Sequence, residues 1–312
     1  MSSPRPRIAF LGPHGTFTEQ ALLTQADLAA GELVPTGSIA DVLAAAASGE
    51  VDLGFVAIEN SIEGTVNVTL DTLAFDAQLL IQREVVINVQ LNLLVPPGME
   101  VADVKTVVSF PHATAQVRRF LAATLPGATT QAANSTAEAA RQVGEAREPG
   151  VAAVGTALAA ELYGLEVAAA DIEDHPENQT RFVVVGTHGV PEPTGHDKTT
   201  VVCFQRTDRP GSLLAILQEF AARAINLTKL ESRPTKRSLG EYCFIIDFEG
   251  HLADELVADC LRNLKAKLAD VKFLGSYPAA GQHGDAVRRD ADASWRAADE
   301  WLGRLRGGVA PR

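Results

Sequence analysis

The sequence predicts an α/β protein with a two-lobed first part and a smaller second domain of different element order. Three observations support this. A chain of 312 residues exceeds one ordinary core, and its 46% hydrophobic and 21% charged residues are typical of a globular protein. Up to residue 190, short apolar strands alternate with helices, as in parallel α/β sheets. After a linker at 191–198, the order becomes strand-helix-strand-strand-helix-strand, the split ferredoxin-like arrangement.

The charge balance and the hydrophobic pattern exclude several classes of protein. A net charge of −12 argues against binding nucleic acid through a basic face. No apolar run reaches the roughly 18 residues of a membrane span, and the first residues lead directly into a strand without a signal segment. We therefore expect a cytoplasmic protein that binds neither nucleic acid nor membrane. A small anionic substrate stays compatible, because one local arginine can outweigh the global field.

Three cysteines, Cys203, Cys243 and Cys260, match no zinc or redox spacing. Each lies in an apolar segment, so we expect buried reduced thiols. The sequence predicts no metal site.

The first lobe begins with an apolar strand at 7–11, and Thr16 is placed to cap a helix at 17–23. The glycine-containing turn between them exposes backbone N–H groups, including that of Gly15, to an anion. Ser38 is expected to cap a second helix at 39–48.

Polar side chains follow the near-continuous apolar strand at 51–58. These are Glu59, Asn60 and Ser61, and ligands of open α/β sheets gather beyond the carboxyl ends of strands. A site is therefore one interpretation of this stretch. A helix entry capped by Ser61 or Asn60 is equally compatible with the pattern.

A helix at 68–75 leads to a long alternating stretch at 82–95, which we interpret as a strand that crosses between lobes. The second lobe is then expected to contain strands and helices in alternation, at 105–109, 112–125, 135–146, 151–154 and 156–163. Ser109 and Gln116 lie at a strand-to-helix junction of this lobe. Ser135 and Thr136 lie at another, where N-capping is the favoured interpretation.

A polar run at 177–182 ends in the apolar stretch 183–186, and it contains Thr180, Arg181 and Phe182. Thr180 offers a hydroxyl, and Arg181 a planar cationic fork suited to carboxylates. On pattern alone, the favoured interpretation is that both residues simply open the strand.

The second domain is expected to contain six elements in the ferredoxin-like order, at 199–205, 211–223, 226–231, 242–248, 254–267 and 271–277. The tail at 279–312 holds Trp295 and Trp301 on a predicted amphipathic helix.

Taken together, several short motifs resemble the prephenate dehydratase family, in order and over residues 7 to 277. They are Gly12-Pro13-His14-Gly15-Thr16-Phe17, Glu59-Asn60-Ser61, Ser109 with Gln116, Thr180-Arg181-Phe182 and Glu231-Ser232-Arg233-Pro234. The resemblance implies a catalytic domain at 1–190 similar to periplasmic binding proteins, with one lobe at about 1–84 and 182–190 and the other at about 85–181. It also implies an ACT regulatory domain at 199–278 that senses phenylalanine, followed by a tail helix at 279–312.

The implied reaction converts prephenate to phenylpyruvate, carbon dioxide and water, and it requires no redox cofactor or metal. The resemblance makes Thr180 the donor to the leaving hydroxyl, and our own hypothesis adds Glu59 as a helper whose pKa burial would raise. Arg181 is either a partner of the side-chain carboxylate or a structural ion-pair residue. The remaining candidates that would bind or orient the substrate are Asn60, Ser109, Gln116, Gly15, Thr16, Ser61, Ser135, Thr136 and Phe182.

The resemblance also places phenylalanine between two facing ACT modules, which implies at least a dimer, as in a dimer or tetramer. One side is Gly211, Ser212, Leu213 and Leu214, and the other is Glu231, Ser232, Arg233 and Pro234. Ser212 stands where the family usually has alanine. Two alternatives stay open, namely dehydration of arogenate and a non-catalytic amino-acid-sensing binding protein.

Overall fold

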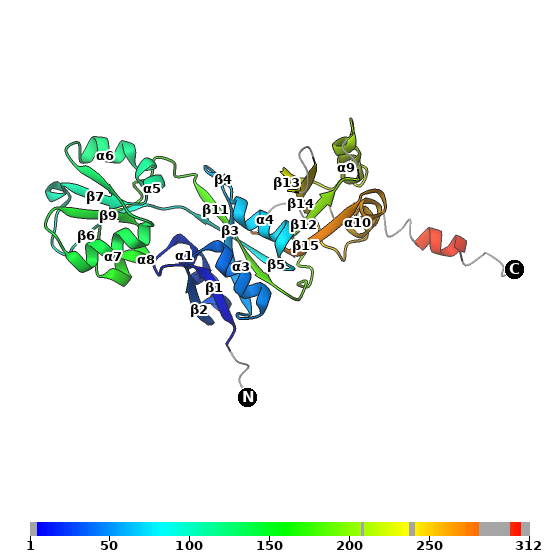
Figure 1. Cartoon of the computed structure of the whole chain (residues 1–312), viewed down its shortest axis with the longest axis horizontal. Helices are drawn as coiled ribbons and strands as arrows, with labels where there is room; N and C mark the ends of the chain where they lie inside the picture. The colour runs from blue at the N-terminus through cyan, green and yellow to red at the C-terminus, as the bar shows by residue number, and fades with distance from the viewer. Residues whose placement is uncertain (1–4, 207–208, 237–240, 281–299, 307–312) are drawn as a thin grey trace. The chain divides into compact units, whose positions relative to one another are not determined.

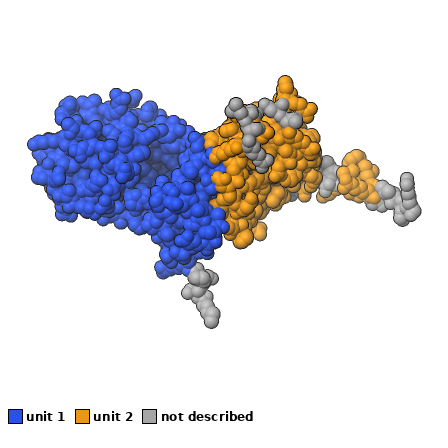
Figure 2. Space-filling view, in the orientation of Figure 1, with its two compact units in different colours: residues 1–72, 85–185 blue, residues 73–84, 186–312 orange. Residues whose placement is uncertain are grey.

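The computed structural model describes residues 5–206, 209–236, 241–280 and 300–306, and it divides into two compact units. Unit 1 comprises Met1–Thr72 and Val85–Val185, and unit 2 comprises Leu73–Glu84 and Gly186–Arg312 (Figure 2). Within the described ranges, no helix combines the length and apolar character needed to cross a membrane. Of the two tail tryptophans, Trp301 lies in a helical stretch at 300–306, and Trp295 lies outside the described residues.

The first lobe is built on a sheet with the order β2-β1-β3-β11-β5, with the short β4 paired to β3 (Figure 1). Its strands are β1 (Arg7–Leu11), β2 (Glu32–Thr36), β3 (Leu53–Asn60), β4 (Gly64–Thr65), β5 (Leu80–Asn88) and β11 (Gln179–Gly186). β1 is parallel to β2 and β3, whereas β11 is antiparallel to β3. The buried centre of this sheet includes Phe10, Phe55 and Phe182.

The helices of the first lobe are α1 (Phe17–Leu23), α2 (Ala26–Ala29), α3 (Ile39–Ser48) and α4 (Asn67–Asp71), which continues into a π-helical turn at Thr72–Asp76. The predicted caps are confirmed. Thr16 accepts a hydrogen bond from the backbone of Glu19, and Ser38 accepts one from the backbone of Asp41.

The second lobe is built on a sheet with the order β10-β6-β9-β7-β8. Its strands are β6 (Asn92–Val95), β7 (Thr106–Ser109), β8 (Thr129–Ala132), β9 (Val151–Gly155) and β10 (Glu166–Ala169). Its helices are α5 (Pro111–Ala115), α6 (Arg118–Thr124), α7 (Thr136–Ala146) and α8 (Ala157–Tyr163), with a 3₁₀ turn at Val101–Asp103. Two buried clusters, one on each side of this sheet's central strands, hold the lobe together.

Two extended segments connect the lobes. The stretch predicted as one strand at 82–95 is two strands in different sheets, because β5 ends at Asn88 and β6 begins at Asn92. The chain returns between β10 and β11, and the two crossing segments bond to each other, Val89 N donating to Asn178 O at 2.8 Å and Ile172 N to Leu91 O at 2.8 Å. The predicted two-lobed architecture is confirmed, since each lobe has its own sheet.

The single helix predicted at 112–125 is wrong, since it is divided into α5 and α6 at Gln116. The returning segment supplies the cause. Asp174 N donates to Gln116 O at 2.6 Å, and the Asp174 carboxylate accepts from Arg119 N at 3.1 Å. One residue from another part of the chain thus satisfies the end of one helix and the start of the next.

Unit 2 contains the second sheet domain, with the strand order β13-β14-β12-β15. Its elements are β12 (Asp197–Phe204), α9 (Ser212–Ala221), β13 (Leu227–Pro234), β14 (Tyr242–Glu249), α10 (Glu255–Lys267) and β15 (Asp270–Pro278), so the predicted ferredoxin-like order is confirmed. The three cysteines are buried and reduced, and burial raises the pKa of the Cys203 and Cys260 thiols to about 12. They are therefore packing residues of this core.

Candidate active site

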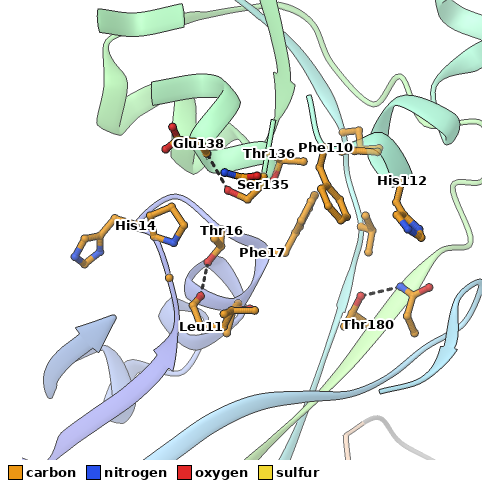
Figure 3. A pocket seen from close by; sticks show the side chains of 18 of the residues that line it. Leu11, His14, Thr16, Phe17, Phe110, His112, Ser135, Thr136, Glu138 and Thr180 are labelled. Carbon is orange, nitrogen blue, oxygen red and sulfur yellow. Dashed lines mark hydrogen bonds between the residues drawn. The ribbon is translucent and has the colours of Figure 1, made fainter. Parts of the chain in front are cut away.

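A cavity of about 850 Å³ lies in unit 1 and is lined by residues of both lobes (Figure 3). The unit is visibly hollowed between its lobes in Figure 2. Gly37, just before α3, and Ser135 and Thr136, at the start of α7, belong to its wall. Helix N-termini carry unpaired N–H groups and a positive dipole end, so this wall favours an anionic ligand.

The lining contains no lysine or arginine, and all the lining residues are described. Its titratable side chains are His14, His112 and Glu138. A hydrogen bond from Arg141, helped by one from Gln142, lowers the pKa of Glu138 and keeps it ionised. The cavity therefore presents neutral hydrogen-bond donors and helix N-termini to an anion, and its lining contains no lysine or arginine.

The floor of the cavity is formed by Asn60 and Thr180, which are paired residues of β3 and β11. Asn60 Nδ2 donates to Thr180 Oγ1 at 2.9 Å. The other end of the amide is also committed, because Asn60 Oδ1 accepts from the backbone N–H groups of Ile62 and Glu63, both at 2.9 Å. Of the two interpretations of residues 59–65, the helix entry is wrong, since this stretch is the turn between β3 and β4.

Asn178 connects this floor to the second lobe. Its side chain is 1% exposed, and its Oδ1 accepts from Asn60 Nδ2 at 2.9 Å. Its Nδ2 donates to Gln116 Oε1 at 3.1 Å, across the lobes. Gln116 and Asn178 both line the cavity. Asn178 was not among the residues predicted from the sequence, although it belongs to the same polar run as Thr180.

Glu59, Arg181 and Phe182 do not line the cavity. Side chains alternate along a strand, so the neighbours of Asn60 and Thr180 point to the other face of the sheet. There, Arg181 Nη1 lies 3.4 Å from Glu59 Oε2, and the two side chains are 11% and 38% exposed. Phe182 is buried and stacks on Phe55 with ring centroids 5.2 Å apart.

Two of the three serines predicted for the catalytic site, Ser61 and Ser109, also lie outside the lining. Ser61 Oγ accepts from Gln179 N at 2.9 Å and lies 3.3 Å from Asn178 Oδ1, so it supports Asn178. Ser109 is fully buried, and its hydroxyl donates to Val154 O at 2.9 Å within the second lobe. Both serines therefore support residues around the cavity and do not face its interior.

The turn after β1 joins the two lobes on another side of the cavity. Thr156 Oγ1 donates to Gly15 O at 2.8 Å, and Tyr163 OH donates to His14 O at 2.8 Å. Gly15 has φ +90°, and a Cβ there would lie 3.1 Å from that of Ala159. Glycine is therefore required both by the backbone and by the close approach of α8.

Among the helix-capping candidates, Thr16, Ser135 and Thr136 line the cavity, whereas Gly15 does not. The Thr16 hydroxyl donates to Leu11 O at 3.2 Å and caps α1. Ser135 Oγ accepts from Glu138 N at 2.9 Å, so the N-capping interpretation of this junction is confirmed.

His112 forms a second, exposed link between the lobes. Its Nδ1 lies 3.2 Å from Glu63 Oε2, with side chains 60% and 48% exposed, and its ring stacks on Phe110. Both His112 and Phe110 line the cavity (Figure 3).

The residues proposed for effector binding lie in the second sheet domain. Gly211, with φ +87°, is the N-cap of α9, and Ser212, Leu213 and Leu214 form its first turn, in which Leu214 is 58% exposed. Glu231, Ser232, Arg233 and Pro234 end β13, whose residues are alternately half-buried and exposed. β13 is an edge strand of the described sheet.

No cluster of three or more histidine, cysteine, aspartate or glutamate side chains that could hold a metal ion occurs among residues 5–206, 209–236, 241–280 and 300–306. A two-lobed α/β domain with a ligand-sized cavity at its strand ends, followed by a ferredoxin-like domain, is typical of a protein that binds or converts a small molecule and carries a second module. The sequence profile of the prephenate dehydratase family matches residues 8–190, and that of the ACT domain matches residues 199–266. The chain belongs to the prephenate dehydratase family.

Individual relatives agree with this assignment. A prephenate dehydratase from Mycolicibacterium vanbaalenii is 47% identical over 305 residues, covering 93% of this chain and 97% of the relative. The solved structure of a prephenate dehydratase from Arthrobacter aurescens in complex with L-Phe is 39% identical, with a TM-score of 0.86 over 97% of this chain and 100% of the other. Another solved chain, described as GqqA, a novel type of quorum quenching acylase, is 31% identical, with a TM-score of 0.78 over 88% and 98% of the two chains.

Proposed function

We propose that this chain is a lyase that converts prephenate to phenylpyruvate, with the cavity of unit 1 as its active site. Prephenate carries two carboxylates and an allylic ring hydroxyl. The bond between the ring and its carboxylate breaks, and carbon dioxide leaves. That electron pair moves into the ring and expels the hydroxyl, which takes up one proton and leaves as water. Aromaticity of the product supplies the driving force, so the protein must position the substrate and assist the departure of the hydroxyl.

The observation that carries this proposal is the state of the Thr180 hydroxyl. An amide nitrogen is only a donor, so Thr180 Oγ1 must accept from Asn60 Nδ2. Among the described residues, Thr180 Oγ1 has no other hydrogen-bond partner, so its hydrogen is available to the cavity that Thr180 lines. Thr180 can therefore donate a hydrogen bond to the hydroxyl that leaves the ring, while the proton that completes the water molecule comes from solvent.

The absence of lysine and arginine from the lining suits the carboxylate that must depart, and the ionised Glu138 of the lining is itself an anion. A lysine or arginine beside the ring carboxylate would stabilise the ground state and oppose loss of carbon dioxide. The start of α7 at Ser135 and Thr136, together with Gln116, is proposed to anchor the other carboxylate. Asn60 and Thr16 also line the cavity, but their polar hydrogens are already donated within the protein, so they shape the site. The residues proposed to act from outside the lining are Gly15, Ser61, Ser109, Glu59, Arg181 and Phe182.

We further propose that phenylalanine regulates the enzyme through the second sheet domain, which we take as residues 199–278, with the catalytic domain at 1–190. The relative from Arthrobacter aurescens binds L-Phe. β13 lies at the edge of its sheet, where a second copy of the chain can add a strand, so we propose a dimer or a tetramer. Phenylalanine would bind between Gly211–Leu214 of one copy and 231–234 of the other. A cytoplasmic location stays a prediction from the sequence.

One assay tests the catalytic proposal. Purified protein is incubated with prephenate, and phenylpyruvate is followed by its absorbance in alkali, with arogenate as the comparison substrate. We expect phenylpyruvate from the wild type, a loss of about 10²–10⁴-fold in kcat for Thr180→Val, and substantial activity for Thr180→Ser, which keeps the hydroxyl. Equal activity of all three proteins would exclude Thr180 as the donor, and no product from the wild type would exclude the function.

The regulatory proposal is tested on the same protein. Added phenylalanine is expected to change the activity, and Gly211→Val, which places a β-branched side chain at a positive φ, is expected to abolish that response without changing basal kcat. Sedimentation with and without phenylalanine measures the oligomer. An unaltered rate at saturating phenylalanine would contradict the proposal.

A further inference from the structure

We propose that Asn178 is a positioning residue that makes Gln116 present its amide donor, rather than its oxygen, to the cavity that Thr180 also lines. The inference rests on the proposed function of the cavity and adds a residue that controls the polarity of its floor. Asn178 lies between the two lobes in sequence and bonds to side chains of both.

The direction of these hydrogen bonds is set by the main chain of the turn after β3. The backbone N–H groups of Ile62 and Glu63 both donate to the Asn60 side chain, so the atom that faces them must be the carbonyl oxygen. Asn60 Nδ2 is thereby turned towards Thr180 and Asn178. The orientation of Asn60 follows from two donors that cannot reverse.

The orientation of Asn60 then determines the orientations of the Asn178 and Gln116 amides. Because Asn60 Nδ2 is a donor, the facing atom of Asn178 must be its Oδ1, at 2.9 Å. Asn178 Nδ2 then faces Gln116, whose facing atom must be Oε1, at 3.1 Å. This leaves Gln116 Nε2, which has no hydrogen-bond partner among the described residues, to donate to a ligand in the cavity.

The result is a branched relay of fixed polarity that starts at two backbone N–H groups. Asn60 orients Thr180 directly, and it orients Gln116 through Asn178. One cavity donor is the Thr180 hydroxyl hydrogen, and the other is the Gln116 amide. Asn178 is 1% exposed, so water does not compete for its hydrogen bonds. A donor at Gln116 suits the carboxylate that we propose it anchors, and a donor at Thr180 suits the hydroxyl that leaves the ring.

The substitution Asn178→Asp tests the relay, because it keeps the shape and changes one donor. An ionised aspartate has only acceptors, so Gln116 must turn its Nε2 towards it and point its oxygen into the cavity. A protonated aspartate can donate to Gln116 Oε1 and restores the original polarity. Burial favours the protonated form, so the new group titrates above the usual range of aspartate.

We expect kcat/KM of Asn178→Asp to fall about 10²-fold as pH rises through one ionisation that the wild type lacks, and to recover on acidification. The neighbouring titratable groups are the same in the wild type and in the variant. Only an ionisation that appears in the pH profile of Asn178→Asp and not in that of the wild type therefore counts as evidence. The neighbouring groups are Glu59, Glu63, His112, Glu173, Asp174, His175, Glu177 and Arg181. A profile of Asn178→Asp that parallels the wild type would overturn the proposal.

A second measurement couples the two amides. Gln116→Leu is made in the wild type and in Asn178→Asp, and both are assayed at high pH. We expect Gln116→Leu to reduce kcat/KM in the wild type and to have little further effect in Asn178→Asp, where Gln116 already presents its oxygen. Full additivity of the two losses would contradict the relay.

The matched control is Asn92→Asp, which also buries a carboxyl group but lies in β6 outside the cavity lining. It should lower the unfolding midpoint without adding an ionisation to kcat/KM. Should Asn178→Asp not fold, Asn178→Ser replaces it. A hydroxyl can donate or accept, so this variant should lose the orientation of Gln116 and raise KM, and wild-type kinetics would overturn the proposal.

These outcomes separate the relay from the proposed function. If the wild type does not form phenylpyruvate, the function fails. If the wild type is active and the Asn178 variants share its kinetics, only the relay fails.

Discussion

The two faces of the β3 and β11 pair differ in chemistry, although consecutive residues of the same two strands supply their side chains. On the cavity face, Asn60 and Thr180 are neutral and form a hydrogen bond. On the other face, Glu59 and Arg181 are charged and pair with each other. Every full charge at this strand end is therefore kept out of the cavity. The difference shows that one strand pair can assign reaction chemistry to one face and ion pairing to the other.

The largest effect is expected on the cavity face. Asn60→Asp keeps the oxygen that accepts from the backbone of Ile62 and Glu63, but it removes the donor to Thr180 and Asn178. We expect kcat to fall on the order of 10²-fold, since the Thr180 hydroxyl loses its orienting donor. Steady-state assays with circular dichroism as the folding control measure this. A kcat within twofold of the wild type would contradict the division between the faces.

A smaller effect is expected where the turn after β1 meets the second lobe. Gly15→Ala places a Cβ at φ +90° and 3.1 Å from Ala159. We expect a loss of about 1–3 kcal/mol in the free energy of unfolding, together with an increased KM, because Thr16 lines the cavity. Urea denaturation and kinetics check both. Gly49→Ala is the matched control, since its φ is +76° with open space around it, and it should alter stability but not KM.

The ion-pair face should affect stability more than catalysis. Arg181→Met and Glu59→Gln each break a half-buried pair, and we expect a cost of about 1 kcal/mol in unfolding, with kcat within threefold of the wild type. This expectation opposes the sequence-based hypothesis that Glu59 helps Thr180 as an acid. A Glu59→Gln variant as inactive as Thr180→Val would restore that hypothesis.

The smallest effect is expected at the exposed link between the lobes. A double-mutant cycle of His112→Gln and Glu63→Gln should give a coupling free energy of about 0.2–1 kcal/mol, because both side chains are largely exposed. The coupling should act on KM, since His112 lines the cavity. Strict additivity in KM would show that this pair has no part in closing the lobes.

Local patterns predicted the helix starts well. Thr16, Ser38 and Ser135 are caps whose signal lies within three residues of the chain, and all three cap as expected. The order of the six elements in the second sheet domain was likewise readable from period and turns. These features are determined by interactions between residues close together in the chain, so they can be predicted from the sequence.

Features that depend on distant residues were not predictable. The break between α5 and α6 comes from Asp174, 58 positions after Gln116, and no local signal marks it. β2, β8 and β10 were missed because they are short edge strands, and β8 is exposed at all four residues, so its pattern does not alternate. Which face Glu59 takes depends on where β3 ends, and β3 extends two residues beyond the predicted strand.

The turn that follows β3 limits which substitutions the family can accept at these positions. Its two peptide groups orient Asn60 whatever side chains Ile62 and Glu63 carry. Almost any mutation there leaves these peptide groups unchanged, and only proline deletes one. Laboratory evolution of this loop should therefore tolerate broad variation in composition while rejecting proline, because the inherited element is a conformation and not a residue.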